Sequence, residues 1–86
     1  LLAQIKSVKH TTVKNGKNAG QEMARIRIED STATMENYSL LAFPAEYKEY
    51  RDYIREDMVC LIYVKTMSSG DALILQRMEV IWELVL

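Results

Sequence analysis

The sequence is poor in the residues that most often carry metal, redox or nucleophilic chemistry, with one cysteine and one histidine. Cys60 can form no internal disulfide, and its neighbours Val59 and Leu61 predict a buried thiol. A zinc site needs about four ligands, and a nucleophile needs a base beside it, but nothing in the spacing around His10 supplies either set. We therefore predict no metal, no cofactor and no catalytic residue. The missing disulfide favours a reducing, cytoplasmic setting.

Long hydrophobic runs are also missing. No apolar run approaches the roughly 20 residues of a membrane span, and Leu1-Leu2-Ala3 lacks the basic lead and the cleavage site of a signal peptide. The 86 residues suffice for one domain that buries a core without a metal or a disulfide. Because the sequence opens without methionine and runs directly into apolar residues, we expect 1–86 to be a single domain cut from a longer chain, and a monomer in isolation.

Neither sign of charge is in large excess over the whole chain, whose net charge is −1, but the charges are unevenly distributed. Residues 1–28 hold six basic residues against one acidic residue, a balance of +5, whereas residues 29–86 hold five basic against eleven acidic residues, a balance of −6. Such a distribution suits a protein that binds a polyanion on a basic surface and repels it from an acidic surface on the opposite side.

Residues 22–30 alternate strictly between apolar and polar side chains. Ala24, Ile26 and Ile28 fall on one side, which predicts a half-buried strand. On the other side, the guanidinium groups of Arg25 and Arg27 stand about 7 Å apart along the strand. Arginine pairs with phosphate through two N–H donors and also lies flat on bases. The strand is therefore a candidate nucleic-acid platform, and the alternative is a solvated strand face.

The first predicted strand, at 1–13, contains an irregularity. Ile5 and Val8 lie three residues apart and cannot share one face of a regular strand, so we predict a β-bulge near Lys6-Ser7 that turns both of them inward. A bulge bends a strand sharply, and small barrels need a curved first strand in order to close. The segment 14–20 contains an Asn-Gly pair and is predicted to be a loop.

The period of the apolar residues changes after Pro44. Tyr47, Tyr50 and Ile54 recur at spacings of three and four, which predicts an amphipathic helix of about three turns with proline at its first position. Its tyrosines are expected to pack on the rest of the domain rather than to bind a ligand, and its basic residues are expected to pair with neighbouring acids. The remaining predicted strands are 38–43, 58–66 and 72–81.

Three strands, one helix and two strands in 86 residues are the order of the oligonucleotide/oligosaccharide-binding (OB) barrel. We therefore predict an all-β, five-stranded Greek-key barrel with one α-helix between strands 3 and 4. In that architecture strands 2 and 3 and the loops between strands 1 and 2 and between strands 4 and 5 bind the ligand. These elements correspond here to 22–30, 37–43, 14–20 and 67–71, and the helix is expected to plug the far end of the barrel.

Four segments together resemble the OB domain of the bacterial DNA polymerase III alpha subunit. They are Lys9-His10-Thr11-Thr12-Val13-Lys14-Asn15-Gly16-Lys17, Met23-Ala24, Ile28-Glu29-Asp30 and Phe43-Pro44-Ala45-Glu46-Tyr47-Lys48-Glu49-Tyr50. The resemblance covers nearly all of the chain in the same order, and related OB domains of aminoacyl-tRNA synthetases and nucleases share much of the strand pattern. It implies a module that holds single-stranded template near a replicative polymerase, with the catalytic aspartates in another domain.

The sequence departs from the family pattern in two places. Arg25 stands where the family usually has an aromatic residue, and an arginine there could either stack on a base or contact phosphate. Because Tyr38 is the only aromatic candidate on the third strand, base stacking is expected to be sparse. The segment between Asp30 and Phe43 is about three residues longer than in the pattern, which leaves open whether Tyr38, Leu40 or Leu41 faces the ligand.

We expect a domain without enzymatic activity that binds single-stranded nucleic acid, with DNA preferred, beside other domains or subunits of a replicase. The predicted contacts are cations of the basic part, one aromatic residue and one residue of the 67–71 flap: Lys9, Lys14, Lys17, Arg25, Arg27, Tyr38 and Ser69. Two alternatives remain open. One is a protein-interaction OB module whose sheet face is covered by a partner, and the other is an OB domain that binds tRNA or another RNA.

Overall fold

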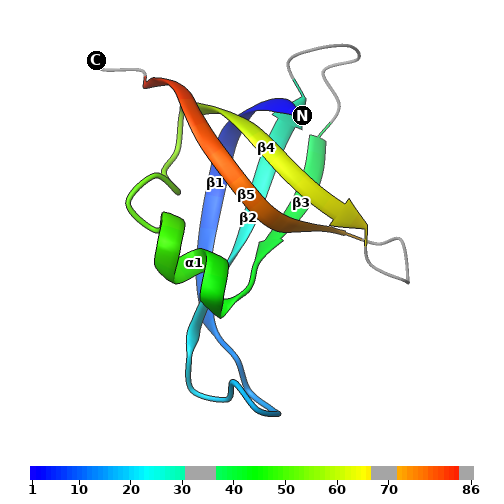
Figure 1. Cartoon of the computed structure of the whole chain (residues 1–86), viewed down its shortest axis with the longest axis vertical. Coiled ribbons are helices and arrows are strands. Elements are labelled where there is room, and N and C mark those ends of the chain that lie inside the picture. The colour runs from blue at the N-terminus through cyan, green and yellow to red at the C-terminus, as the bar shows by residue number, and fades with distance from the viewer. Residues whose placement is uncertain (31–36, 67–71, 84–86) are drawn as a thin grey trace.

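The computed structural model describes residues 1–30, 37–66 and 72–83 (Figure 1). Within these ranges the chain forms five strands and one helix in the predicted order. The elements are β1 (Leu2–Thr12), β2 (Glu22–Asp30), β3 (Asn37–Ala42), α1 (Pro44–Tyr50), β4 (Met58–Thr66) and β5 (Leu73–Glu83).

The strands close into a barrel in the order β1-β2-β3-β5-β4. Neighbouring strands are antiparallel except β3 and β5, which run parallel where Leu40 and Leu41 pair with Leu73 and Ile74. The pairing of β1 with β4 completes the ring. The prediction of a five-stranded, OB-like barrel with one helix between strands 3 and 4 is confirmed.

The predicted bulge lies in β1. Ile5 pairs with Ile28 and Ser7 with Arg27, so Lys6 is the extra residue. Ile5 is buried, and Val8, three residues further along, is partly buried and packs against the same core. The bulge therefore turns both apolar side chains inward, as the sequence predicted.

The core is built mainly from alternating residues of the strands. Ala24, Ile26 and Ile28 of β2 are buried, with exposed fractions of 1% or less. Leu40 of β3 and Ile62 of β4 reach the same cluster from neighbouring strands. Each fully buried isoleucine or leucine stabilises the fold by about 1.5–3 kcal/mol, so β2 is held with one face fixed inward and the other fixed outward.

The helix is shorter than predicted. Pro44 occupies the start of α1 as expected, but α1 ends at Tyr50 after seven residues instead of three turns. The amide of Tyr53 donates to the carbonyl of Tyr50 at 2.8 Å, three residues back, so the chain tightens into turns beyond this point. Ile54 is still buried. The apolar residue that suggested a third helical turn is thus carried into the core by a turn.

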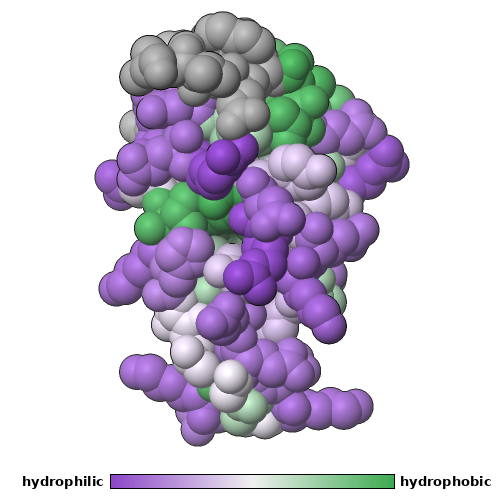
Figure 2. All heavy atoms as spheres, turned by 90° about the vertical axis from the view of Figure 1, so that its left-hand side faces the viewer, coloured by the Kyte–Doolittle hydropathy of each residue, from purple (hydrophilic) through white to green (hydrophobic). Residues whose placement is uncertain are grey.

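The helix lies at the end of the barrel from which the β1–β2 loop projects (Figure 1). Tyr47 is buried, and Tyr50 packs against the core cluster, as expected for a plug. The side of the molecule shown in Figure 2 is largely hydrophilic, with apolar surface in separate patches. No helix of the described residues is long and apolar enough to cross a membrane.

Candidate nucleic-acid interface

The outer face of β2 carries two arginines, each set between side chains of the neighbouring strands. Arg25 and Arg27 are exposed, and they alternate with the buried isoleucines of the same strand. Lys9 of β1 is the direct cross-strand partner of Arg25. Arg27 pairs with Ser7 of β1 on one side and with Ser39 of β3 on the other. Because side chains of directly paired residues lie on the same side of a sheet, these five residues form one surface.

This surface is hollowed. Its residues line a pocket of about 370 Å³ over the middle of β1, β2 and β3. Four of the residues predicted from the sequence contribute to the lining, namely Lys9, Arg25, Arg27 and Tyr38. Ser7 and Ser39 also line the pocket, and they were not predicted, because their position depends on the pairing register of the strands. We call Ser7, Lys9, Arg25, Arg27 and Ser39 the strand face.

The cations of the strand face are not neutralised. Among the described residues, Lys9, Arg25 and Arg27 form no ion pair. Two cations elsewhere in the described ranges are paired: Lys6 lies 3.6 Å from Glu29, and Arg77 pairs with Glu79. Like charges directly opposite each other on neighbouring strands are destabilising, so the Lys9–Arg25 pair adds an unfavourable term to the folded state. An anion bound between them would remove this repulsion.

The register of β3, left open by the sequence, follows from its pairing with β2. Leu40 pairs with buried Ile26 and Tyr38 with buried Ile28, so both side chains share the core side. Leu41 pairs with Arg25 and belongs to the outer side, although only 8% of it is exposed. Tyr38 is partly buried and packs against the core while also lining the hollow.

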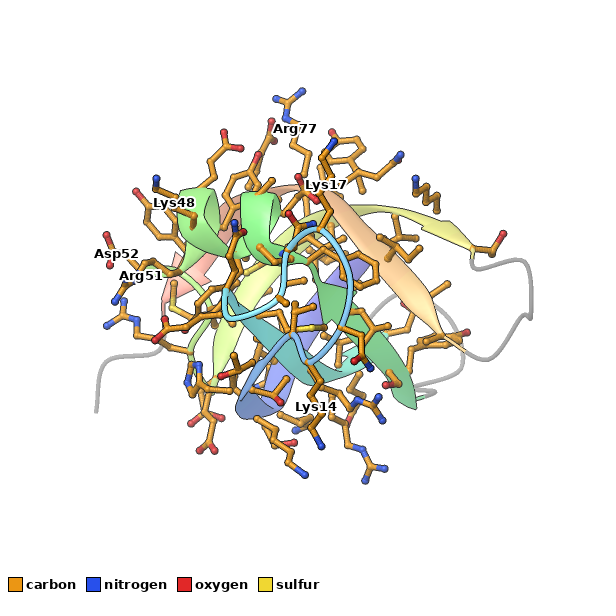
Figure 3. The ribbon with its side chains drawn as sticks, turned by 90° about the horizontal axis from the view of Figure 1, so that it is seen from below. Lys14, Lys17, Lys48, Arg51, Asp52 and Arg77 are labelled. Atoms are coloured by element: carbon orange, nitrogen blue, oxygen red, sulfur yellow. The ribbon has the colours of Figure 1, made fainter. Side chains whose placement is uncertain are left out.

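The β1–β2 loop carries the two predicted lysines, which point in opposite directions. Gly16 and Gly20 have φ angles of 89° and 88°, values that L side chains rarely adopt. Figure 3 shows Lys14 on the side of β1 and β2 and Lys17 on the side of α1 and β5. Of the two predicted lysines, only Lys14 therefore extends from the loop on the side of β1 and β2. Ser69 lies outside the described residues.

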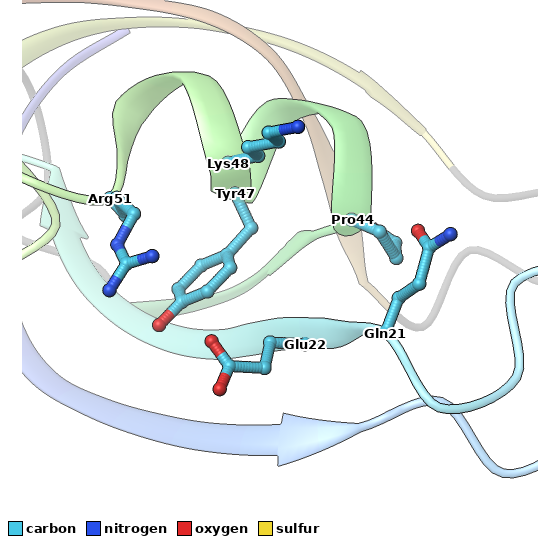
Figure 4. Close-up of a pocket in the computed structure, with 6 residues that line it drawn as sticks. All are labelled: Gln21, Glu22, Pro44, Tyr47, Lys48 and Arg51. Carbon is cyan, nitrogen blue, oxygen red and sulfur yellow. The ribbon is translucent and has the colours of Figure 1, made fainter.

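A second pocket, of about 340 Å³, lies between α1 and the start of β2 (Figure 4). The side chains of Arg51, Tyr47 and Glu22 point toward a common space. Lys48 lies on α1, next to Tyr47. This pocket was not predicted from the sequence, because it arises from the packing of α1 against β2. Two cations and one carboxylate line it, whereas the lining of the strand face holds three cations and no acid. The strand face is therefore the better site for a polyanion.

Cys60, the one cysteine of the sequence, is buried. Burial raises the pKa of the Cys60 thiol to about 11, which favours the neutral, unreactive form. No group of three or more His, Cys, Asp or Glu side chains within the described ranges is arranged to hold a metal ion.

Comparison of the chain with protein-family models, with curated proteins and with solved structures finds no match.

Proposed function

We propose that this domain binds single-stranded nucleic acid across the strand face. The observation that carries the proposal is the direct pairing of Lys9 with Arg25 on adjacent strands, with Arg27 beside them and none of the three in an ion pair within the described ranges. A fold that keeps like charges together at a cost in stability gains from a bound anion. A ligand with many phosphates satisfies all three cations at once.

The interaction is electrostatic and hydrogen-bonded. Each guanidinium can donate two parallel N–H bonds to one phosphate, and the Lys9 ammonium acts as a mobile point charge. Following the sequence resemblance, we propose DNA as the ligand and a replicative polymerase of the DNA polymerase III alpha type as the parent chain. In that setting the domain holds the template strand while another domain carries out catalysis.

Salt-dependent titration tests the proposal. Binding of a labelled oligothymidylate to the isolated domain should fall with salt at a slope of about −2 to −3 in log K against log salt, for three or four phosphates at about 0.7 each. The dissociation constant should be micromolar or weaker, because stacked bases, which contribute roughly 1–3 kcal/mol each, are few. Absence of binding at low salt, or binding without a salt slope, would overturn the proposal.

The second candidate is a protein-interaction module, and exposed apolar residues on β4 and β5 favour it. Ile81 is 56% exposed, and Tyr63 and Val80 are also exposed. Single exposed hydrophobic residues are common on monomers, whereas like charges directly opposite each other on adjacent strands are destabilising, so this candidate ranks second. A partner that binds through β4 and β5 would leave the oligonucleotide titration unchanged, and one that covers the strand face would compete with the oligonucleotide.

A further inference from the structure

We infer that the strand face recognises the phosphodiester backbone alone, with the phosphates toward the sheet and the bases turned to solvent. This inference rests on the proposed function and adds which part of the ligand is read. Its consequence is a defined ligand class: any chain of suitably spaced phosphates, whatever its bases, with those bases left free to pair with a complementary strand.

The groups that line the strand face match the hydrogen-bonding capacity of a phosphate. The charged groups of the strand face, on Lys9, Arg25 and Arg27, are hydrogen-bond donors only. Ser7 and Ser39 add hydroxyl groups beside Arg27. A phosphate offers only acceptors, so every one of these groups can serve it. The edge of a base presents donors as well as acceptors, and no carboxylate lines the hollow to accept from them.

Within the described ranges, the strand face offers no aromatic platform for stacked bases. Proteins that bind single strands through their bases place aromatic rings on the binding surface. Tyr38 is the one aromatic residue among those lining the hollow within the described ranges. It belongs to the core side of β3 and packs against the core. On the outer side, the neighbour of Arg25 along β3 is Leu41, which is itself almost fully buried.

The spacing of the two arginines also suits a chain of phosphates. Arg25 and Arg27 lie two residues apart on one strand, a rise of about 6.6–6.8 Å, which is comparable to the separation of successive phosphates along an extended single strand. Lys9 lies across from Arg25 at the distance of adjacent strands. One strand of phosphates can therefore run along β2 and meet a guanidinium at each of two successive positions. A guanidinium that stacked on a base instead would leave the repulsion between Lys9 and Arg25 unrelieved.

The test compares three probes of equal length on the isolated domain: oligothymidylate, an abasic oligodeoxynucleotide with the same number of phosphates, and a thymine peptide nucleic acid with a neutral backbone. We expect the first two to bind within about twofold of each other and with equal salt slopes, and the third not to bind. The double variant R25Q/R27Q should weaken both anionic probes by the same factor, while the matched K48Q/R51Q variant should weaken them less.

The outcomes separate the two proposals. An abasic probe that binds about tenfold or more weakly than oligothymidylate, the loss expected for one stacked base, would overturn backbone recognition and leave nucleic-acid binding intact. Binding of the peptide nucleic acid would do the same. Failure of all three probes to bind at low salt would overturn the proposed function itself, and backbone recognition with it.

Discussion

His10 on β1 and Tyr47 on α1 share a hydrogen bond, with 2.8 Å between the imidazole Nδ1 and the phenol oxygen. The rings meet edge to face, with centroids 5.8 Å apart. The two residues are 37 positions apart in the sequence, so the contact ties the β1–β2 hairpin to the helix. The helix is thus held by a polar contact in addition to the burial of Tyr47.

Replacing Tyr47 with phenylalanine keeps the buried ring and removes the hydroxyl. We expect Y47F to lower the free energy of unfolding by about 0.5–1.5 kcal/mol, the net contribution of one hydrogen bond. Urea denaturation measures this loss. Oligonucleotide affinity should stay the same, because Tyr47 does not line the hollow of the strand face. Unchanged stability would mean that the hydrogen bond to His10 contributes nothing in solution.

The sequence was sufficient to predict features that depend on local periodicity. The alternation of β2 fixed which residues are buried, and the three-residue step from Ile5 to Val8 located the bulge. Both predictions hold because side chains alternate between the two faces of a strand, so the position of a residue along its own strand decides which face it occupies. The predicted end of α1 was wrong, by contrast. A turn buries Ile54 as well as a third helical turn would, so the apolar spacing could not distinguish the two.

The candidate site was predicted in part for the same reason. Arg25 and Arg27 share a face because they lie two apart on one strand, and this required no tertiary information. The position of Lys9 opposite Arg25 depends on the extra residue of the bulge, and the roles of Ser7 and Ser39 follow only from the register. Contacts between distant segments, such as His10 with Tyr47, leave no periodic signal in the sequence.

Burial of Cys60 predicts a pH-dependent stability. Since burial raises its pKa from 9.0 to about 11, the unfolded chain loses the thiol proton first as the pH rises. The stabilising contribution is therefore complete below about pH 9 and is lost progressively as the pH rises toward 11. Urea denaturation of the wild type and of Cys60→Ala measures it: the difference in unfolding free energy should shrink across this range. A difference that stays constant would contradict the raised pKa.

Reversing the charge of Lys9 should separate stability from binding. K9E places opposite charges across from each other where Lys9 and Arg25 now repel, so we expect a gain of about 0.2–1 kcal/mol in unfolding free energy together with weaker oligonucleotide binding. K65E is the matched control, because Lys65 is exposed and pairs with Ile74 rather than with a charge. Denaturation and titration of both variants test this. A loss of stability in K9E with unchanged binding would contradict the role of the pair.

We expect the cations of β2, rather than those beside α1, to bind the ligand. Replacing Arg25 and Arg27 together with alanine should weaken oligonucleotide binding by about 1–3 kcal/mol, because charge-assisted hydrogen bonds to phosphate are lost. The salt slope should flatten by about 1.4 units, because each of the two phosphate contacts removed contributes about 0.7. The matched double variant K48A/R51A removes the same formal charge from the pocket beside α1, so long-range attraction falls equally in both variants and only the local contacts differ. Equal losses, or a larger loss for the helix pair, would place the binding surface away from β2.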